Sequence, residues 1–410
     1  GRTRAVKRRF DCVDVLVAGG GPAGIGAAIA AARNGAATLL VERSNCLGGM
    51  LTSGLVPMIR TAGDNGGVVR ELRERMQELD AAQVTATHAF LNPGVARVAA
   101  LNLALAAGVR LLLHTVAAGI EQTGQTSIGV RLAGKDGLRT LRCRLAVDAT
   151  GDGDLAAWAG AAFLKGRETD GVLQAVSLNF LLGGVAFSEL PSQEEFDRIT
   201  AEALQRGELE LAGPNARLSR GHQLASLPPG VAWFQSDMAG GVDATDPESL
   251  TQGEIICHQR VVNIWRFLRR TFPAYRNSVI LNVASALGVR ETRRICGMQT
   301  LTEDDVLEAR KHPDGVARSA WYMDLHDPEP RGPDHRKRRS VPEGDFYDIP
   351  YGCLVPPTVP NLLVAGRCIS STRPANGSLR LQHTCINLGQ AAGTAAALCV
   401  QRGIQPCDLA

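Results

Sequence analysis

Six residues near the start of the chain, Gly-Gly-Gly-Pro-Ala-Gly at positions 19–24, have the composition and spacing of a phosphate-binding turn. In this GxGxxG pattern Gly19 permits a tight turn, Gly21 lets the backbone approach a pyrophosphate, and Gly24 lets a helix lie close to a strand. Glu42 follows 18 residues after the last glycine, where an acidic side chain can accept hydrogen bonds from ribose hydroxyls. These residue types predict the binding of a dinucleotide.

A second glycine-rich loop, Cys-Leu-Gly-Gly-Met-Leu-Thr-Ser-Gly at 46–54, comes soon after Glu42. An FAD molecule lies extended and needs contacts beyond the first turn, so this loop favours FAD over NAD. No other GxGxxG follows a strand-like segment, and a separate NAD(P)H domain is therefore not expected. A covalent flavin link through Cys46 is the alternative, but non-covalent FAD is favoured because most cysteines in such loops are unlinked.

The hydrophobic pattern indicates which elements must position these loops. Residues 13–18 form a continuous apolar run, as expected for a strand buried on both faces, and residues 37–41 form a second run. An Ala-rich helix over 25–33 connects them, so the glycine turn lies inside a βαβ frame. Two alternating runs at 127–132 and 140–147 predict a β meander.

Beyond residue 163 the glycine turns become sparser and the segments lengthen. We interpret residues 163–350 as an α+β substrate domain with helices over 193–206 and 248–270. A strand is expected at 289–295, where charged residues alternate. By the two-residue period of a strand, Arg290 and Arg294 share one face, and Glu291 and Arg293 share the other. One face could enter a pocket and contact an anionic group bidentately.

Composition excludes several classes of function. The 410 residues include 44 Lys+Arg and 41 Asp+Glu, and this net charge of +3 is too balanced to indicate nucleic-acid binding. No run of about 18–20 apolar residues is present, so no membrane span is expected. The basic start is not followed by the apolar segment of a signal peptide, and the ten cysteines contain no CxxC pair, so no metal site is expected. A cytoplasmic location with reduced thiols is the expectation.

Four stretches of the chain carry a family resemblance. They are the turn at 19–24 with Glu42, the loop at 47–56, the segment at 289–306, and the segment at 347–396 that ends in Gly-Gln-Ala-Ala-Gly-Thr-Ala-Ala. The chain resembles the FAD-dependent oxidoreductases of the glutathione-reductase-type fold, and among them a bacterial family distantly akin to fumarate reductase flavoproteins. The resemblance implies a Rossmann-like FAD/NAD(P)-binding domain of three layers (ββα), built from residues 1–162 and 351–410. The substrate domain at 163–350 is inserted between these two parts.

The resemblance also implies how the cofactor would be held. It places Val116 near the adenine and makes the Ala-Thr-Gly at 149–151 a second nucleotide-contacting turn. A helix that starts near Gly389 and Gln390 would direct its N-terminus at the flavin. The cofactor contacts that follow from the motifs and the resemblance are Gly19, Gly21, Pro22, Ala23, Gly24, Glu42, Arg43, Gly48, Gly49, Met50, Thr52, Val116, Thr150, Gly151, Gly366, Arg367, Gly389, Gln390 and Ala391.

One residue departs from the pattern of the related flavoproteins. Many of them carry an acidic residue after the glycine that ends the last strand, where it meets the ribityl chain. Here Gly366 is followed by Arg367. Because flavin hydroxylases carry a Gly-Asp pair at this place, their chemistry is the less favoured one.

Three residues are the candidates for chemistry on a substrate. Arg380 and Leu381 look like the Arg-Leu pair that holds a substrate carboxylate in the fumarate-reductase relatives, and His383 is the candidate base. Arg290 is the third candidate, and the second-tier candidates are Tyr322, Asp324, His326, Tyr347 and Tyr351. A structural arginine and a satisfied loop histidine are the competing interpretations of Arg380 and His383.

The first hypothesis for function is an oxidase or dehydrogenase that takes a hydride from a small organic molecule to flavin N5. The alternatives are a reductase of an activated C=C bond and a protein that holds FAD without turnover. The expected partner is a small-molecule substrate, for which an anion is one option, and a homo-oligomer is left open.

Overall fold

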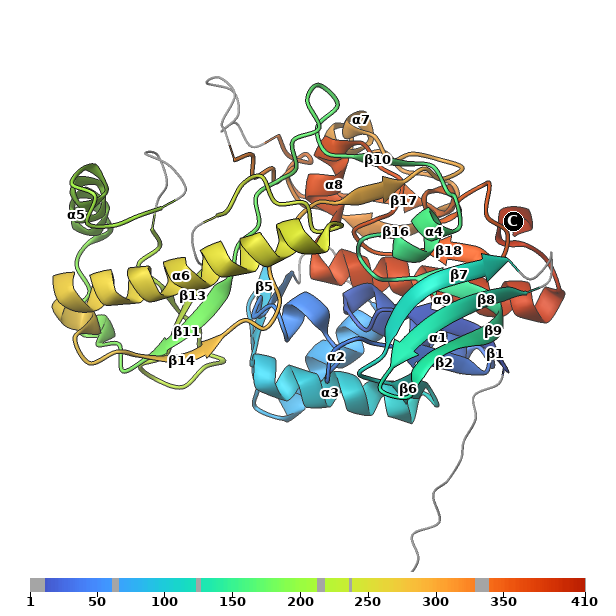
Figure 1. Cartoon of the computed structure of the whole chain (residues 1–410), viewed down its shortest axis with the longest axis horizontal. Helices are drawn as coiled ribbons and strands as arrows, with labels where there is room; N and C mark the ends of the chain where they lie inside the picture. Colours follow the sequence, from blue (N-terminus) through green and yellow to red (C-terminus); the bar gives the residue numbers. More distant parts are fainter. Residues whose placement is uncertain are drawn as a thin grey trace, which may run out of the picture.

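The computed structural model describes residues 12–60, 66–122, 127–211, 218–235, 238–328 and 339–409. Their arrangement is mixed α/β, with one large sheet and several smaller ones (Figure 1). Among these residues no helix is both long and apolar enough to cross a membrane.

The large sheet is built around β1 (Cys12–Ala18). On one side β1 pairs in parallel with β2 (Thr38–Val41), which pairs with β6 (Arg110–Leu112). On the other side it pairs in parallel with β9 (Gly137–Asp148), and β18 (Leu362–Val364) joins the end of β9. The register places the last residues of β1, β2, β9 and β18 side by side at one edge, where ligands bind in open parallel sheets.

The first half of β9 belongs to a second layer. Residues 137–143 pair antiparallel with β8 (Ile128–Gly134), which pairs with β7 (Val116–Gln122). Helices α1 (Pro22–Arg33), α2 (Gly67–Glu78), α3 (Pro93–Ala106) and α9 (Gln382–Arg402) form the third layer (Figure 1). The β meander and the three-layer Rossmann-like arrangement expected from the sequence are therefore confirmed.

Helices α1 and α9 lie in parallel with their backbones in contact. A Cβ atom at Gly389 would be 1.9 Å from the carbonyl oxygen of Ala23, and one at Gly393 would be 2.0 Å from that of Ala27. The contact is as close on the other helix, because a Cβ atom at Gly26 of α1 would be 2.1 Å from the carbonyl oxygen of Ile386 in α9. Since Gly389 lies beside the first turn of α1, the preceding residues of α9 extend beyond α1 by about 10 Å, at about 1.5 Å per residue.

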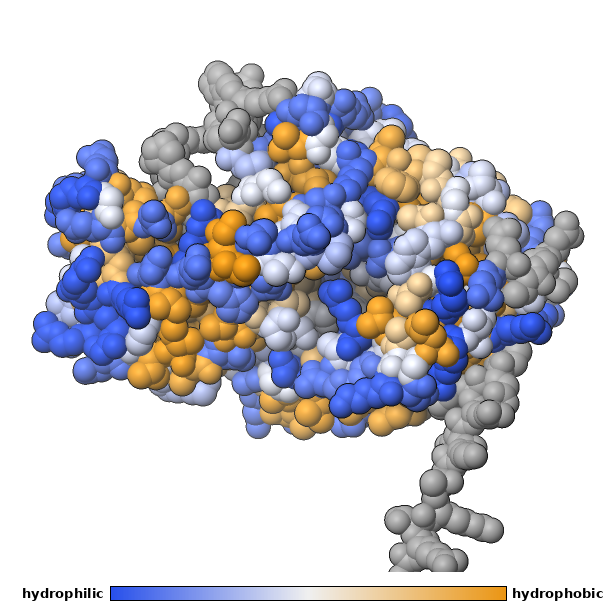
Figure 2. Space-filling model, in the orientation of Figure 1, coloured by the Kyte–Doolittle hydropathy of each residue, from blue (hydrophilic) through white to orange (hydrophobic). Residues whose placement is uncertain are grey.

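A second group of elements has its own core. Its antiparallel sheet has the order β12 (His222–Gln223), β13 (Ala232–Gln235), β11 (Asn179–Gly183) and β14 (Val279–Val283). Helices α5 (Gln193–Gln205) and α6 (Pro247–Thr271) complete it. Stacked aromatic pairs fill the core, with ring centroids 5.0 Å apart for Phe180 and Phe234. Val279 and Leu281, two residues apart on β14, are exposed. Apolar surface is visible at the lower left of Figure 2, in the region of this sheet.

Within the described residues, the remaining strands form three small sheets, and three short helices belong with them. They are β3 (Met58–Arg60), β4 (Ala82–Val84), β5 (His88–Leu91), α4 (Asp154–Trp158), β10 (Phe163–Lys165), β15 (Arg293–Ile295), α7 (Glu303–Leu307), β16 (Gly315–Ser319), β17 (Tyr347–Pro350) and α8 (Arg373–Leu379). Ile295, Tyr347 and Ile349 are buried in the same core as β1, whereas the second core contains Leu55 and residues between 176 and 287. The division between the two cores does not coincide with residue 350, the expected end of the substrate domain. This domain boundary stays a prediction.

Candidate active site

The glycine turn at 19–24 leaves an open space at the start of α1. Gly19 has φ +98°, and a Cβ there would be 2.4 Å from the carbonyl oxygen of Ala149; one at Gly24 would be 1.7 Å from the carbonyl oxygen of Gly19. These two positions therefore require glycine for the turn itself. A Cβ at Gly21 would meet no atom within 4 Å, although Gly21 is the N-cap of α1. This space fits a pyrophosphate, because a helix N-terminus offers unpaired N–H donors to an anion.

The carboxylate of Glu42 lies against this turn. It accepts hydrogen bonds from the backbone N–H of Gly20 at 2.6 Å and of Ser44 at 2.7 Å. The backbone N–H of Thr115 donates to the carbonyl of Glu42 at 3.1 Å, so the start of β7 with Val116, which is 46% exposed, lies next to it. Arg43 is exposed, and its positive charge acts against the rise that burial causes in the pKa of Asp154.

The second glycine loop lies on the first. The N–H of Gly48 donates to the carbonyl of Gly20 at 2.8 Å, and a Cβ at Gly49 would be 2.9 Å from the Cα of Gly21. Thr52 is buried and its hydroxyl donates to the carbonyl of Leu47 at 2.8 Å, so its side chain stabilises the loop. The tip of Met50 approaches Gly54 and Gly288. Cys46 is a free thiol whose sulfur lies 3.4 Å from the hydroxyl of Ser53.

The turn at 148–154 is held by Asp148. Its carboxylate accepts hydrogen bonds from the N–H and hydroxyl of Thr150 and from the N–H of Ala156, and burial raises its pKa to about 6. Arg367 donates to the carboxylate of Asp152 at 2.7 Å, and its guanidinium lies 3.2 Å from where a Cβ of Gly151 would be. The arginine at this position therefore forms an ion pair with the second nucleotide turn.

The end of β18 adjoins the same place. Gly366 has φ +92°, and a Cβ there would be 2.9 Å from the Cβ of Ala23. Ala23 is thus contacted by both Gly366 and Gly389. The structure brings together the turns at 19–24, 48–49, 150–151 and 366–367, as their predicted role in cofactor binding requires.

The expected start of the last helix near Gly389 is wrong, because α9 begins at Gln382. Gly389 contacts α1, and the side chain of Gln390 accepts a hydrogen bond from the N–H of Val68 at 2.9 Å. Ala391 lines a cavity of about 1210 Å³ between α9 and the hairpin β16–β17, on another face of the helix. The glycines that suggested a helix start serve the close approach of α1 and α9.

The actual start of α9 has unpaired polar groups. Leu381 is its N-cap and supplies no capping side chain. Among the described residues, the buried Oε1 of Gln382 and the buried Oγ1 of Thr384 have no hydrogen-bond partner. Because α9 extends beyond the glycine turn, its start lies where the distal part of an extended dinucleotide bound at α1 would reach. A helix N-terminus there favours negative charge on a bound ring.

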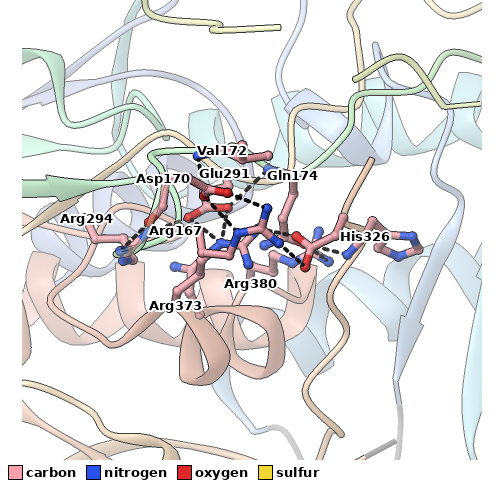
Figure 3. A network of polar contacts seen from close by, with 12 residues as sticks. Arg167, Asp170, Val172, Gln174, Glu291, Arg294, His326, Arg373 and Arg380 are labelled. Carbon is pink, nitrogen blue, oxygen red and sulfur yellow. Dashed lines mark hydrogen bonds and ion pairs between the residues drawn. The ribbon is translucent and has the colours of Figure 1, made fainter. Parts of the chain in front are cut away.

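A buried ion network adjoins the start of α9 (Figure 3). Glu291 bonds Arg294 at 2.5 Å and Arg373 at 2.9 Å, and Arg373 also bonds Asp327 at 2.5 Å. Asp327 and Asp170 both pair with Arg167. This network fixes α8 to the segment before β15. Because each carboxylate of this network is paired with an arginine, it is a structural element rather than a free binding group.

Arg380 and Arg290 are buried next to this network. Arg380 donates to the carbonyl of Asp324 at 2.6 Å and lies 3.4 Å from the Asp324 carboxylate. Arg290 donates to the carbonyl of Ala175 at 2.7 Å and to the hydroxyl of Ser177 at 3.1 Å. Burial lowers the pKa of Arg290 to about 9, and the positive charge of Arg380 adds to this effect. The structure thus brings two predicted site residues close enough to interact.

The expected alternation of charges at 289–295 is wrong. Only Arg293–Ile295 form a strand, since the partner β10 is three residues long. Glu291 bonds Arg294 instead of lying on the opposite face, and Arg293 pairs with Asp154 at 2.8 Å. Arg290 therefore lies beside Arg380 in the candidate site, whereas Arg294 belongs to the ion network around Glu291.

His383 lies in the first turn of α9 and is only 3% exposed. Its Nδ1 accepts the backbone N–H of Arg60 at 3.4 Å, and burial lowers its pKa to about 3, with the charge of Arg60 adding to the effect. An imidazole with such a pKa is a weak base near neutral pH. The geometry therefore favours the interpretation of His383 as a satisfied structural histidine.

His326 is a better-placed titratable group. Its Nε2 lies 3.0 Å from the carboxylate of Asp324, and the ring, 27% exposed on its side chain, points away from the arginines in Figure 3. Burial would raise the pKa of Asp324, but the hydrogen bond from His326 and the charges of Arg380 and Arg290 lower it to about 2. Burial lowers the pKa of His326, and the bond to Asp324 offsets only part of this.

Sequence reasoning missed Gln174 and gave Asp324 and His326 only a minor place. The spacing of Asp324 and His326 is a usable signal, because residues two apart in an extended segment lie on one side. Gln174 lies more than 200 residues before Arg380, to which its side chain bonds, and no local pattern marks it.

Comparison with solved structures shows the fold at low sequence identity. BexE, from a study of oxidation during BE-7585A biosynthesis, is 15% identical with a TM-score of 0.53 over 95% of this chain and 63% of its own. CabE, an aromatic hydroxylase from angucycline biosynthesis, is 15% identical with a TM-score of 0.46 over 70% of this chain and 54% of its own. A geranylgeranyl bacteriochlorophyll reductase-like protein from Thermoplasma acidophilum is 13% identical, with a TM-score of 0.47 over 96% of this chain and 79% of its own.

The chain thus spans 63% of the length of BexE and 54% of the length of CabE. A search of curated proteins gave no match. The family model of FAD dependent oxidoreductases, in contrast, matches residues 14–410. Together with the open glycine turn at α1, this match shows that the chain belongs to the FAD dependent oxidoreductase family, with FAD as its cofactor.

Proposed function

We propose that this enzyme takes a hydride from a small organic substrate and passes it to FAD. The observation that carries the proposal is the position of Arg380, which directly precedes the N-cap of α9 and is buried beside Asp324. Polar side chains that can hold a substrate therefore adjoin the helix end that is expected to face the flavin. When bound, FAD supplies the hydride acceptor.

The chain's own residues would bind the substrate and accept its proton. Arg380 and Arg290 supply positive charge, so we expect the substrate to carry a negative one. Since His383 is a weak base, we assign proton transfer to His326. Its Nε2–H can donate to Asp324, which leaves Nδ1 to accept a proton from a substrate hydroxyl or amine.

Hydrogen bonds between the segments around the site support a site from which water is excluded. Gln382 donates to the carbonyls of Val56 and Met58, and the N–H of Ser285 donates to the carbonyl of Ser53. The second glycine loop is thereby fixed both to α9 and to the group of elements with the second core.

We propose that the elements with the second core determine which substrate binds. We also propose that the enzyme works in the cytoplasm, since no described cysteine forms a disulfide.

A reductase of an activated C=C bond is the second candidate, because the same arginines would hold an unsaturated acid. Anaerobic mixing distinguishes the two. A panel of alcohols, amines, amino acids and hydroxy acids is added to the oxidised holoenzyme, and activated alkenes are added to the reduced one. Bleaching of the oxidised flavin supports the proposal; reoxidation by alkenes without any bleaching would support the reductase instead.

A further inference from the structure

The arginines beside α9 differ in their partners. Arg167, Arg294, Arg373 and Arg380 form ion pairs with the carboxylates of Asp170, Glu291, Asp324 and Asp327. Among the described residues Arg290 has no carboxylate within ion-pair distance, and its donors reach only a carbonyl and a hydroxyl. His326 adds no charge near neutral pH, because its pKa lies below the ordinary value. A buried charge without a partner is costly, so a ligand that brings one negative charge would stabilise Arg290.

The same place has donors without acceptors. Gln174 is 1% exposed, and its Oε1 accepts from the guanidinium of Arg380 at 3.4 Å and from the N–H of His326 at 3.1 Å. Two donors on one atom fix it as the amide oxygen, so the other end of the side chain is the NH2 group. Within the described part of the chain, this Nε2 and the Nε of Arg380 are buried and have no partner. Each such buried group destabilises the site until an acceptor arrives.

We propose that Gln174, Arg290 and Arg380 form a subsite for one carboxylate group of the substrate. This inference rests on the proposed function, because it assigns the binding end of the same substrate. A carboxylate brings the single negative charge that Arg290 lacks, and its two oxygens can accept from several N–H groups at once. Gln174 is the specificity-determining residue, since its amide adds donors without adding charge.

A doubly charged group such as phosphate fits less well. It would bring a second negative charge, for which Arg290 offers no partner, into a buried place with Asp324 already present. A neutral amide would supply one carbonyl acceptor but would bring N–H donors toward the arginines. We therefore expect this subsite to bind a carboxylate more tightly than phosphate or an amide.

The test is binding to the FAD-loaded enzyme, measured by calorimetry and by the shift in melting temperature. The probes are acetate, propionate and benzoate, the matched acetamide, propionamide and benzamide, and inorganic phosphate. We expect at least tenfold tighter binding of a carboxylate than of its amide. Gln174→Glu, which puts a competing carboxylate into the subsite, should abolish carboxylate binding. Gln174→Met, which only removes the donors, should weaken it about tenfold, which corresponds to about 1.4 kcal/mol.

Gln252→Glu is the matched control, because it adds the same charge at an exposed position of α6. Retained yellow colour shows that each variant is folded around FAD. Equal binding of carboxylates and amides, tighter binding of phosphate, no binding of any probe, or unchanged carboxylate binding in both Gln174 variants would each overturn the inference. None of these readouts requires hydride transfer. If carboxylates bind as expected but no substrate reduces the flavin, the proposed function fails and the subsite stands.

Discussion

Gly389 of α9 lies against the carbonyl oxygen of Ala23 in α1, so closely that a Cβ atom would be 1.9 Å from it. This contact fixes how far the start of α9 extends beyond the glycine turn. The distance between the predicted pyrophosphate site and the candidate active site therefore depends on a pair of helices that only glycine allows to meet.

Gly389→Ala should consequently destabilise the protein. The added methyl group must push apart two buried backbones, and overpacking of this kind costs about 1–3 kcal/mol. Thermal unfolding of the FAD-free protein would measure it. Ala201→Val, which adds bulk at an exposed position of α5, should leave the melting temperature nearly unchanged. An equal effect of the two substitutions would show that the helix contact is less tight than the structure has it.

Gly21→Ala separates cofactor binding from folding. Its φ of −69° suits any residue, and a Cβ would meet no atom of the protein within 4 Å. The FAD-free protein should therefore melt as the original does, while FAD binding weakens at least tenfold because the methyl group occupies the pyrophosphate space. Gly24→Ala, with a Cβ 1.7 Å from the carbonyl of Gly19, should instead lower stability itself. Full FAD affinity in Gly21→Ala would place the pyrophosphate elsewhere.

Glu42→Ala should weaken FAD retention without unfolding the chain. A charge-assisted hydrogen bond to a ribose hydroxyl contributes about 1.5–3 kcal/mol, or about 10- to 100-fold in affinity. Titration of the FAD-free protein with FAD, followed by flavin fluorescence, gives the ratio. Glu74→Ala, on the exposed side of α2, is the control. Identical FAD affinity in both variants would remove Glu42 from the site.

Several of these features follow from local sequence, and others do not. The turn at 19–24 and Glu42 are a local pattern, and the structure places both at one edge of the sheet. The start of α9 was misplaced because its N-cap, Leu381, is not a capping residue, whereas Gly389 and Gly393 resemble a helix start but serve contact with α1. Arg290 was expected on a strand, yet its segment is shaped by bonds to Ala175 and Ser177, more than 100 residues earlier. Long-range contacts of this kind leave no local pattern.

Arg380→Ala should raise the substrate KM at least tenfold or abolish turnover. The substitution removes a buried positive charge that pairs with Asp324 and leaves the hydrogen bond from His326 and the charge of Arg290 near this carboxylate. Steady-state kinetics would be compared with those of Arg198→Ala, an exposed arginine of α5. An Arg380→Ala enzyme with unchanged KM and kcat would exclude this side chain from substrate binding.

The rate of flavin reduction should depend on pH through His326. The imidazole must be neutral to accept a proton, and burial lowers its pKa below the ordinary value of about 6.5. The rate should therefore be constant above about pH 6.5 and fall as the pH drops through this lowered pKa. His326→Gln should be slower by about 100-fold or more and should lose this acid limb. An unchanged acid limb in His326→Gln would assign the proton to another group.

Anaerobic reduction of the bound flavin tests the central claim most directly. Purified, FAD-loaded enzyme is mixed in the absence of oxygen with small hydroxy and amino acids, and the absorbance of the oxidised flavin is followed. We predict that at least one such carboxylic acid bleaches the flavin, and that its neutral amide does so at least tenfold less efficiently. If no member of the panel bleaches the flavin while activated alkenes reoxidise the reduced enzyme, hydride transfer runs in the opposite direction and the account is wrong.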